Sequence, residues 1–141
     1  WGRYQRHRRP FAVIILDLDG FKQVNDRFGH QTGDRSLQWL AAHLRRCSRQ
    51  GDIAARLGGD EFALLLPETA ADAARVVLDR LRTDVGSDRT LIDRRTGDVV
   101  DLRISGGVAT PDERTSDADY IVHAADTQLY ARKAERSAHT E

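Results

Sequence analysis

The chain has 141 residues, with 22 basic side chains from Lys and Arg against 22 acidic side chains from Asp and Glu. This length and a hydrophobic content of 40% predict one globular domain that folds without a disulfide or a structural metal. A net charge of zero argues against binding of long nucleic acid through its phosphates, but is compatible with a small phosphorylated ligand. The single cysteine, Cys47, predicts a reducing compartment, the cytoplasm, and no apolar run is long enough for membrane insertion.

The distribution of residue types contains two further signals. The chain lacks Met and begins at Trp1, so we interpret it as a piece excised from a longer protein. Of the 22 basic residues, only Lys22 and Lys133 are lysines. Because a flexible ammonium and a planar guanidinium suit different ligands, these two positions are candidates for a specific role.

The first expected elements are a polar beginning and a buried strand. Residues 1–10 are polar and basic and predict no regular structure. Residues 11–18 (FAVIILDL) form a continuous apolar run rich in branched side chains, which predicts a strand buried on both faces. Asp17, Asp19 and Gly20 follow its apolar part, so acidic side chains are expected at the end of this strand.

A helix and a hairpin are expected next. Residues 21–33 predict a helical turn followed by a loop, and apolar residues at helical spacing predict a helix from Asp34 onward. Alternating apolar residues on either side of Gly58 and Gly59 predict a β-hairpin that ends at Pro67. The apolar positions are Leu37, Leu40, Ala41 and Leu44 in the helix, and Ile53, Ala55, Leu57, Phe62, Leu64 and Leu66 in the hairpin.

The second half of the chain predicts three more elements. Thr69 is expected to cap a second helix. A second hairpin is expected over 90–109, with its turn near 96–98, and a last helix is expected to begin near Ser116. The element order predicts an α+β fold with a ferredoxin-like core, βαββαβ, extended by an extra hairpin strand and a C-terminal helix. We expect a mostly antiparallel sheet with the helices of this core on one face.

Acidic residues and glycines point to a metal-dependent reaction. Asp17 and Asp19 lie two positions apart at a strand end, so their side chains share one face. In a ferredoxin-like sheet the first strand pairs with the hairpin, which brings Asp17 near Asp60 in the 58–61 turn. Converging carboxylates at an exposed sheet end suit Mg²⁺ or Mn²⁺, and such a site predicts phosphoryl or nucleotidyl transfer. The alternative is that both segments are only turn-forming sequences.

Other kinds of catalytic site find no support in the sequence. It contains no G-x-x-x-x-G-K-[ST] motif, which excludes a P-loop nucleotide site. No set of Ser, His and Asp residues suggests nucleophilic catalysis, and the five His residues do not have the spacing of metal ligands.

Several short motifs occur in a fixed order along the chain. The string RLGGDEF occupies residues 56–62. The other motifs are DLDGFK at 17–22, VND at 24–26, FGH at 28–30, GD at 33–34, SGGVA at 105–109, AD at 125–126, LY at 129–130 and Lys133. Together they resemble the GGDEF family of diguanylate cyclases over about residues 11 to 133. The resemblance implies a fold similar to nucleotide cyclase catalytic domains.

The resemblance also implies an activity and a metal site. Enzymes of this family condense two GTP molecules into cyclic di-GMP, with release of two pyrophosphates, across a homodimer that joins two half-sites. By resemblance, Asp17, the backbone carbonyl of Leu18 and Asp60 would hold Mg²⁺ or Mn²⁺. Asp60 is also the family's proposed general base, and Glu61 would support the metal or orient the attacking 3′-hydroxyl.

Four residues are assigned to the base and the triphosphate of GTP by the resemblance. Asn25 and Asp34 would read the guanine edge, because an amide and a carboxylate together match its acceptor and donors. Asp34 also stands where a helix N-cap is expected, and it can do both. Gly58 and Gly59 would admit the triphosphate close to the backbone, since they have no Cβ.

The two lysines match the family's phosphate-binding positions. Lys22 would stabilise charge in the transition state and Lys133 would contact phosphate, whereas the alternative is two solvated surface lysines. The remaining expected substrate contacts are Phe21, His30 and Arg136, of which Arg136 replaces a family phosphate contact one position early.

A second binding site is expected at Arg49 and Asp52. Arg49-Gln50-Gly51-Asp52 precedes Gly58 at the spacing of the family's inhibitory R-x-x-D motif, where Arg49 and Asp52 would bind the product cyclic di-GMP. The alternative is a helix C-terminus, in which Arg49 interacts with the helix dipole and Gly51-Asp52 ends the helix.

The chain departs from the family pattern at its beginning and in a late strand. The family's Leu-Thr-Gly-Leu and Asn-Arg elements before the first strand are absent, which predicts one GGDEF domain over 1–141 that lacks its N-terminal segment. The string Ser105-Gly106-Gly107 has glycine where the family prefers an aliphatic residue, so we expect a slightly loosened strand.

Three functions are compatible with these motifs. The first is a diguanylate cyclase with product inhibition. The second is a non-catalytic module that binds GTP or cyclic di-GMP and regulates a partner domain, and the third is a cyclase that closes one nucleotide on itself. Degenerate relatives usually lose signature acids, and Asp17, Asp60, Glu61 and Lys22 are all present, so the sequence favours the first.

Overall fold

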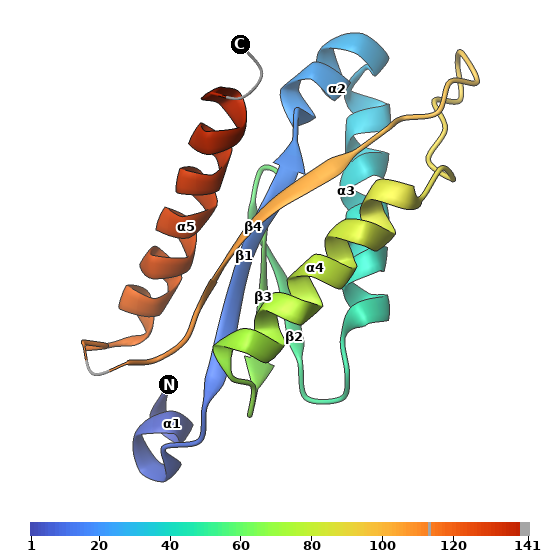
Figure 1. Cartoon of the computed structure of the whole chain (residues 1–141). Coiled ribbons are helices and arrows are strands. Elements are labelled where there is room, and N and C mark those ends of the chain that lie inside the picture. The colour runs from blue at the N-terminus through green and yellow to red at the C-terminus, as the bar shows by residue number, and fades with distance from the viewer. Residues whose placement is uncertain (113, 139–141) are drawn as a thin grey trace.

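A computed structural model describes residues 1–112 and 114–138, in which an antiparallel sheet carries helices on both faces (Figure 1). The strands are β1 (Phe11–Asp19), β2 (Ile53–Gly58), β3 (Glu61–Pro67) and β4 (Arg103–Ala109), in the spatial order β2-β3-β1-β4. The helices are α1 (Gly2–His7), α2 (Phe21–Phe28), α3 (His30–Cys47), α4 (Ala71–Ser87) and α5 (Ala118–Ala138). The predicted α+β fold is confirmed.

The central strand β1 is buried on both faces, as its continuous apolar run predicts. Residues 12–18 are all buried, and β1 pairs with β3 on one side and with β4 on the other. Because side chains alternate along a strand, Ile14 and Leu16 pack into one core while Val13 and Ile15 pack into another. A strand that fills two cores needs helices on both sides of the sheet.

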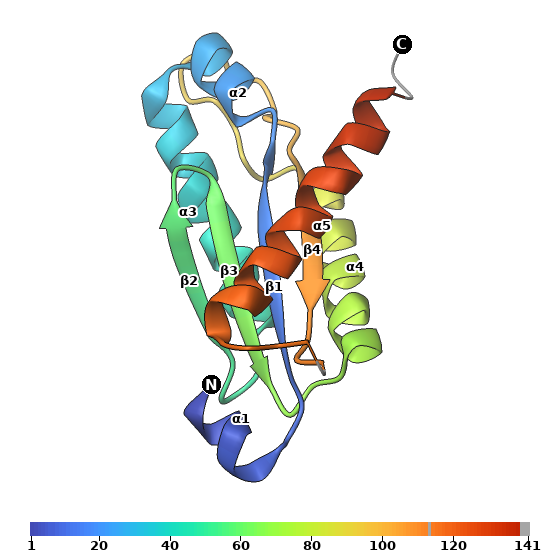
Figure 2. The same cartoon turned by 90° about the vertical axis from the view of Figure 1, so that its left-hand side faces the viewer.

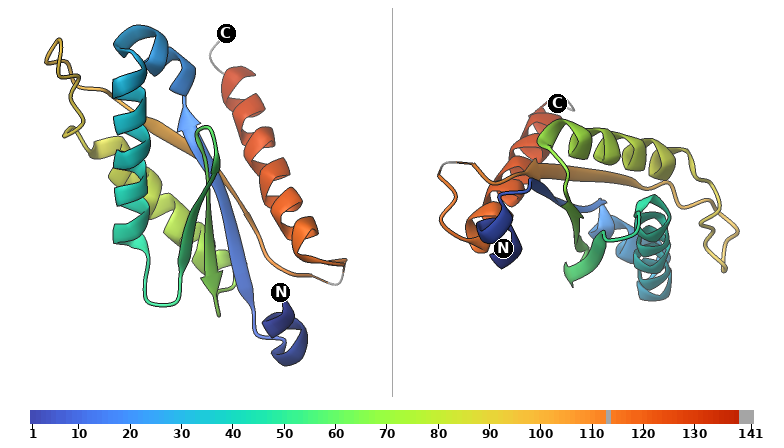
Figure 3. Two further views of the ribbon diagram at one scale, coloured as in Figure 1. Left: turned by 180° about the vertical axis from the view of Figure 1, so that it is seen from behind. Right: turned by 90° about the horizontal axis from the view of Figure 1, so that it is seen from below.

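The helices of the predicted ferredoxin-like core lie on one face of the sheet, as expected, and the C-terminal helix lies elsewhere. Helices α3 and α4 cover one face together with α2, whereas α5 lies alone on the opposite face, where it crosses β1 (Figures 2 and 3). The predicted apolar stripe of α5, formed by Ile121, Ala125 and Leu129, is fully buried there. None of the described helices is long and apolar enough to cross a membrane.

Three expected boundaries in the first half of the chain need correction. Residues 2–7, expected to be irregular, form the short helix α1. The segment expected to be a turn and a loop is the helix α2, and α3 begins at His30 rather than at Asp34. Asp34 therefore lies inside a helix and is not its N-cap. Gly29, at a φ of 87°, makes the corner that separates the two helices.

The second half of the chain also differs from expectation in places. Thr69 does not cap α4: the cap is Ala70, and the Thr69 hydroxyl donates instead to the carbonyl of Pro67. The second hairpin is reduced to one bridge between Ile92 and Val99, although Gly97 lies at its turn as predicted. The last helix begins two residues later than expected, at Ala118.

The edge strand β2 shows why alternation alone does not predict burial. All of its residues are exposed, including Ile53 at 57% and Leu57 at 51%. Its partner β3 has the same alternation but buries Phe62, Leu64 and Leu66, because β3 lies between two strands. Alternation predicts a strand, whereas the position of that strand in the sheet decides what is covered.

Candidate active site

The acidic residues predicted to act together lie at one end of the sheet. The strand register places Asp17 opposite Glu61 of β3 on one side and opposite Ser105 of β4 on the other. The β2–β3 turn, which carries Asp60, lies at this same end, next to the start of α2 (Figure 1). Antiparallel pairing of β1 with the hairpin therefore joins two motifs that are more than 40 residues apart in the chain.

Asp17 is a buried carboxylate with an ion-pair partner on α5. It is 6% exposed, and its Oδ2 accepts a hydrogen bond from Nζ of Lys133. Its Oδ1 is buried and has no hydrogen-bond partner among the described residues. Burial raises the pKa of Asp17; Lys133 opposes this rise, and the carboxylates of Asp60 and Asp19 add to it. The site therefore concentrates negative charge that one ammonium does not fully offset.

Asp126 belongs to the same cluster, although its sequence position suggested no role for it. It lies on α5 two turns before Lys133, so both residues face the sheet. Its Oδ1 is buried and, within the described part of the chain, unpartnered. The pKa of Glu61 is raised, first by burial and next by Asp126. The sequence signal for Asp126 was the AD pair at 125–126, which resembles the family's last helix but to which the sequence assigned no role.

The turn between β2 and β3 has backbone conformations that favour glycine. Gly58 has a φ of 148° and Gly59 a φ of 52°, and a Cβ built on either would have no heavy atom within 4 Å. Nε of Arg56 donates to the carbonyl of Gly59 at 2.9 Å, which holds the turn closed. The glycines thus set the conformation of the turn and leave open space beside the half-buried Asp60.

Asp19 is part of the wall of this site. Its Oδ1 accepts a hydrogen bond of 2.6 Å from the hydroxyl of Ser105 on β4. This bond directs the Asp19 side chain toward β4, so the carboxylates of Asp17 and Asp19 differ in their hydrogen bonding. Asp17 keeps a buried oxygen without a hydrogen bond among the described residues, whereas Asp19 is held by its neighbouring strand.

The donors present fit a hard divalent cation. Carboxylate and carbonyl oxygens are the ligands that Mg²⁺ and Mn²⁺ prefer, and a buried oxygen without a partner, such as Oδ1 of Asp17, is the kind of atom that a cation would satisfy. Within residues 1–112 and 114–138, no group of three or more His, Cys, Asp or Glu side chains could hold an ion by itself. The protein therefore offers a partial shell, which suits an ion shared with substrate phosphates.

The predicted guanine-binding residues lie at the corner between α2 and α3. Asn25 on α2 packs directly over Gly33 on α3, because a Cβ at Gly33 would lie 1.8 Å from Oδ1 of Asn25. Asp34 follows Gly33 and is exposed. The structure therefore places Asn25 beside the backbone that carries Asp34. The sequence suggested that Gly33 belongs to a loop. In the structure it lies in α3, where the lack of a Cβ permits the close approach of Asn25.

The other predicted substrate contacts fall into two groups. Lys22, the second residue of α2, and His30, the first residue of α3, are exposed, and Phe21 packs partly against the core. Lys133 lies at the acidic cluster instead of on the open surface, in contact with Asp17. The side chain of Arg136 lies outside the described residues.

Arg49 and Asp52 lie at the opposite end of β2 from the glycine turn. The Asp52 carboxylate accepts from the backbone N–H of Arg49 at 2.9 Å and from its Nε at 3.4 Å. Nη2 of Arg49 donates to the carbonyl of Pro67 at 2.8 Å and to the Thr69 hydroxyl at 2.6 Å. Helix α3 ends earlier, at Cys47, so these residues form a turn of their own.

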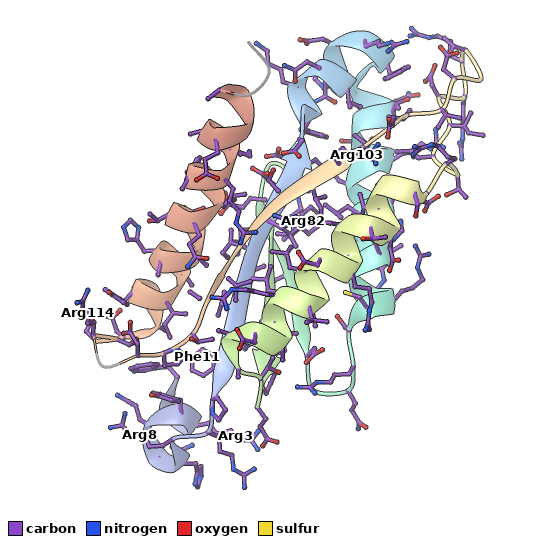
Figure 4. All side chains as sticks on the ribbon, in the orientation of Figure 1. Arg3, Arg8, Phe11, Arg82, Arg103 and Arg114 are labelled. Atoms are coloured by element: carbon purple, nitrogen blue, oxygen red, sulfur yellow. The ribbon has the colours of Figure 1, made fainter. Side chains whose placement is uncertain are left out.

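This turn borders a surface pocket of about 420 Å³. Its lining residues are Arg3, Arg49, Gln50, Gly51, Asp52, Pro67 and Glu68. Arg3 belongs to the N-terminal helix, at the end of the molecule where Figure 4 also labels Arg8 and Phe11. The side chain of Arg49 is 61% exposed, whereas that of Asp52 is only 3% exposed, so within the predicted inhibitory site Arg49 is the residue open to a ligand. The site lies apart from the acidic cluster, at the other end of β2.

Comparisons with known proteins agree with this arrangement. The model of the family described as "Diguanylate cyclase, GGDEF domain" matches residues 1–139. Diguanylate cyclase A of Treponema denticola is 36% identical over 89% of this chain and 33% of its own length. Diguanylate cyclase DgcP of Pseudomonas aeruginosa is 37% identical over 92% of this chain and 19% of its own. The chain thus spans about a third or less of these curated relatives.

Solved structures give the same result. The GGDEF domain of DgcB from Caulobacter crescentus, in complex with c-di-GMP, superposes with a TM-score of 0.89 at 31% identity, over 95% of this chain and 78% of that one. The active GGEEF domain of a diguanylate cyclase from Vibrio cholerae has a TM-score of 0.86 at 27% identity, over 95% and 83% of the two chains.

Proposed function

Because the chain belongs to the family of diguanylate cyclase GGDEF domains, we propose that it condenses two GTP molecules into cyclic di-GMP and releases two pyrophosphates. In this reaction the 3′-hydroxyl of each GTP attacks the α-phosphate of the other, and the bond from that phosphorus to the β-phosphate oxygen breaks. The observation that carries the proposal is the cluster of the buried Asp17 and the half-buried Glu61 beside the glycine turn with Asp60.

We propose Mg²⁺ or Mn²⁺ as the cofactor, held by Asp17, the carbonyl of Leu18 and Asp60. The unpartnered Oδ1 of Asp17 supports this assignment, since a buried oxygen without a hydrogen bond is costly unless a ligand satisfies it. When bound, the ion supplies polarisation of the α-phosphate and a lower pKa for the attacking hydroxyl. Glu61 is proposed to support the ion or to orient the 3′-hydroxyl, and its register opposite Asp17 in the sheet supports this role.

Other residues of the chain would hold the substrate. Asn25 and Asp34 are proposed to pair with the guanine edge, and their neighbouring positions at the α2–α3 corner support a shared ligand. Lys22 is proposed to stabilise charge on the phosphates during transfer, because an exposed ammonium can follow a moving phosphate. Lys133 is proposed to contact phosphate after it leaves Asp17.

Two copies of the chain are proposed to act together. Each chain offers one set of the residues above, whereas the reaction needs two activated α-phosphates in opposed orientations. We therefore propose a homodimer for catalysis, with cyclic di-GMP as inhibitor at Arg49 and Asp52. The open pocket beside Arg49 supports this second site, and we propose the cytoplasm, where GTP is available, as the location.

The test is to identify the product. The domain is fused to a dimerising coiled coil and incubated with GTP and Mg²⁺, and the products are identified by mass spectrometry. We expect cyclic di-GMP and pyrophosphate from the wild type and neither from Asp60→Ala. The matched control is Asp72→Asn, because the Asp72 side chain is 99% exposed on α4, away from the site; it should retain full turnover.

The outcomes separate the remaining alternatives. Binding of GTP without any product in the forced dimer would contradict the cyclase assignment and favour the non-catalytic module. A product cyclised from a single nucleotide would favour a mononucleotide cyclase. Product formation that survives Asp60→Ala would contradict the assignment of the active site while leaving the reaction itself in place.

A further inference from the structure

A buried hydrogen bond joins α3 to the loop between α4 and β4. The Thr32 hydroxyl donates to Oδ1 of Asp93 at 2.8 Å, across 61 positions of sequence. The two residues are only 4% and 2% exposed. None of the chemistry proposed above uses this pair. Thr32 lies in the first turn of α3, directly before Gly33 and Asp34.

Asp93 is the organising residue of its loop. Its Oδ2 accepts from the N–H and the hydroxyl of Thr96, at 3.0 and 2.9 Å. Its own N–H donates to the carbonyl of Asp98, and its carbonyl accepts from the N–H of Gly97, both at 2.8 Å. The hydrogen bond from Thr32 is the main reason why the pKa of Asp93 is lowered, so the carboxylate is charged when it accepts this bond.

A second contact joins the same two segments. Nη1 of Arg35 donates to the backbone carbonyl of Ile92 at 2.7 Å. Arg35 is three residues after Thr32, so both contacts come from the same face of α3. The loop therefore holds the first two turns of α3, one at Thr32 and one at Arg35. In Figures 1 and 2 the loop lies beside the corner formed by α2 and α3.

The first turn of α3 has little local support. The helix has Gly29 at its N-cap, and no side chain caps it. A helix start with Gly at the N-cap is less stable, by a few tenths of a kcal/mol, than one capped by a Ser, Thr, Asn or Asp side chain. The two bonds from the loop supply a tertiary substitute for the missing cap. What they hold in place is the segment that carries Gly33 and Asp34.

The position of this turn also determines the position of Asn25. Because Asn25 packs directly over Gly33, a shift of Gly33 moves the surface on which the amide rests. Asp34 would shift with the same turn. Both proposed guanine-binding groups therefore depend on one short segment, and that segment depends on Thr32 and Asp93.

We propose that Thr32 and Asp93 are positioning residues for guanine recognition. The inference rests on the proposed function, since it requires that Asn25 and Asp34 contact the base. Polar groups discriminate between bases only when they are held in register with the edge that they read. Loosening the Thr32–Asp93 bond is therefore expected to reduce affinity for GTP and preference for guanine, with little effect on the chemical step.

The test uses three substitutions in α3. Thr32→Val keeps the shape but removes the hydroxyl, Thr32→Ser restores a hydroxyl, and Ser36→Ala is the matched control. The Ser36 hydroxyl is buried as well, but its bond, to the carbonyl of Thr32 at 2.8 Å, stays within α3. Binding of non-hydrolysable GTP and ATP analogues is measured by calorimetry with Mg²⁺, and KM and kcat are measured with GTP.

The expected result is a split between binding and chemistry. Thr32→Val should weaken binding of the GTP analogue about tenfold, a loss of about 1.4 kcal/mol, and reduce the preference for the GTP over the ATP analogue by a similar factor. KM should rise accordingly while kcat falls less than about twofold. Thr32→Ser and Ser36→Ala should both resemble the wild type.

Each contrary outcome has a distinct meaning. If folded Thr32→Val keeps wild-type affinity and guanine preference, the inference is wrong and the proposed function stands. If the wild type itself binds no GTP analogue, the proposed function fails first. If Thr32→Val does not fold, Arg35→Gln decides: it removes only the bond to Ile92 and should reduce guanine preference in the same direction.

Discussion

Lys133 on α5 forms an ion pair with Asp17 on β1, although 116 positions separate them. The Asp17 side chain is 9% exposed and that of Lys133 is 34% exposed. The ammonium therefore occupies one oxygen of the carboxylate that is proposed to bind a divalent cation. Because two cations compete for one carboxylate, binding of the divalent ion should release Lys133 toward the substrate phosphates.

Release of Lys133 is expected to be visible by chemical labelling. Lys22 and Lys133 are the only lysines of the chain, so two peptides report on every lysine side chain in a mass spectrum. Mg²⁺ should increase the labelling rate of Lys133 with an amine-specific reagent about fivefold, as expected if about 1 kcal/mol of ion pairing is lost. Lys22 serves as the internal reference.

Asp17→Asn provides the control for this experiment. Without the carboxylate, Lys133 should react rapidly whether or not Mg²⁺ is present. Labelling of Lys133 that stays constant on addition of Mg²⁺ in the wild type, at concentrations that support turnover, would contradict the exchange.

Asp17→Asn is also expected to abolish turnover while raising the Tm of the metal-free protein. Burial raises the pKa of Asp17 above 3.8, so the native state binds more protons than the unfolded state just above that pH. Stability therefore falls as the pH rises from about 4 through the folded pKa, and the loss persists at pH 7. The neutral amide of the variant places no charge in the buried position. Its free energy of unfolding should therefore be higher by about 1 kcal/mol, which raises Tm by about 3 °C.

Calorimetry at two pH values checks this prediction. At pH 7 the variant should melt above the wild type. At pH 3, where Asp17 is protonated in both states, the two proteins should melt at nearly the same temperature. A variant that melts below the wild type at pH 7 would mean that the ion pair with Lys133 outweighs the burial of the charge.

Gly107→Ala is expected to destabilise the protein through α5. A Cβ at Gly107 would lie 2.2 Å from the carbonyl oxygen of Ala125 and 2.7 Å from the amide nitrogen of Leu129, and neither backbone atom can move alone. The helix must shift away from β4, at a cost of about 2–3 kcal/mol. Since α5 also carries Lys133, turnover should fall as well.

Gly106→Ala is the matched control. Its Cβ would face Cδ1 of Leu78 at 2.7 Å on the other side of the sheet, and that side chain can change rotamer. Urea denaturation should show a smaller loss of stability for Gly106→Ala than for Gly107→Ala. Equal losses would indicate that both sides of β4 are equally rigid.

These two glycines illustrate what the sequence can and cannot predict. The sequence suggested that glycine at 106 and 107 loosens the strand, whereas the structure places each against a different helix. Local patterns predict the strands, because alternation and apolar runs are properties of neighbouring residues. Which helix packs on which face depends on contacts between distant residues, and for this reason the sequence did not predict the face that α5 covers.

The candidate site likewise contains some contacts that the sequence predicts and some that it does not. Asp17 and the 58–61 turn were predictable as partners, because pairing of β1 with the hairpin follows from the element order. Asp126 and the pair of Thr32 and Asp93 were not, because their partners lie in segments whose packing no local pattern specifies. Single polar residues beside an apolar stripe are common, and only the folded chain distinguishes a surface residue from a buried one.

The pair of His43 and Asp88 is expected to control stability at acid pH. Nε2 of His43 and Oδ2 of Asp88 lie 2.8 Å apart and join α3 to the end of α4. Burial raises the pKa of Asp88, but hydrogen bonds from the hydroxyl and N–H of Thr90 and from His43 lower it to about 2. The stabilisation is complete above about pH 5 and is lost as the pH falls through about 2.

Asp88→Asn should therefore lower the free energy of unfolding by about 1–2 kcal/mol at pH 7 and by much less at pH 2. Urea denaturation of the wild type and the variant at pH 2, 4 and 7 measures this difference. Asp84→Asn, in the last turn of the same helix and exposed, is the control and should cost little at any pH. A constant difference between Asp88→Asn and the wild type would contradict the assigned pKa.

Arg49→Ala is expected to relieve inhibition by cyclic di-GMP while leaving turnover largely intact. The guanidinium is exposed and lies at the opposite end of β2 from the acidic cluster, so its loss should not disturb the chemistry. It also holds the carbonyl of Pro67 and the hydroxyl of Thr69, so the variant should lose about 1 kcal/mol of stability. Thr69→Ala removes one of these bonds without removing the charge, and it should keep product inhibition.

Initial rates at increasing concentrations of cyclic di-GMP, with calorimetric binding to each variant, measure the effect. Inhibition of Arg49→Ala as strong as that of the wild type would show that the product acts elsewhere, at the active site itself.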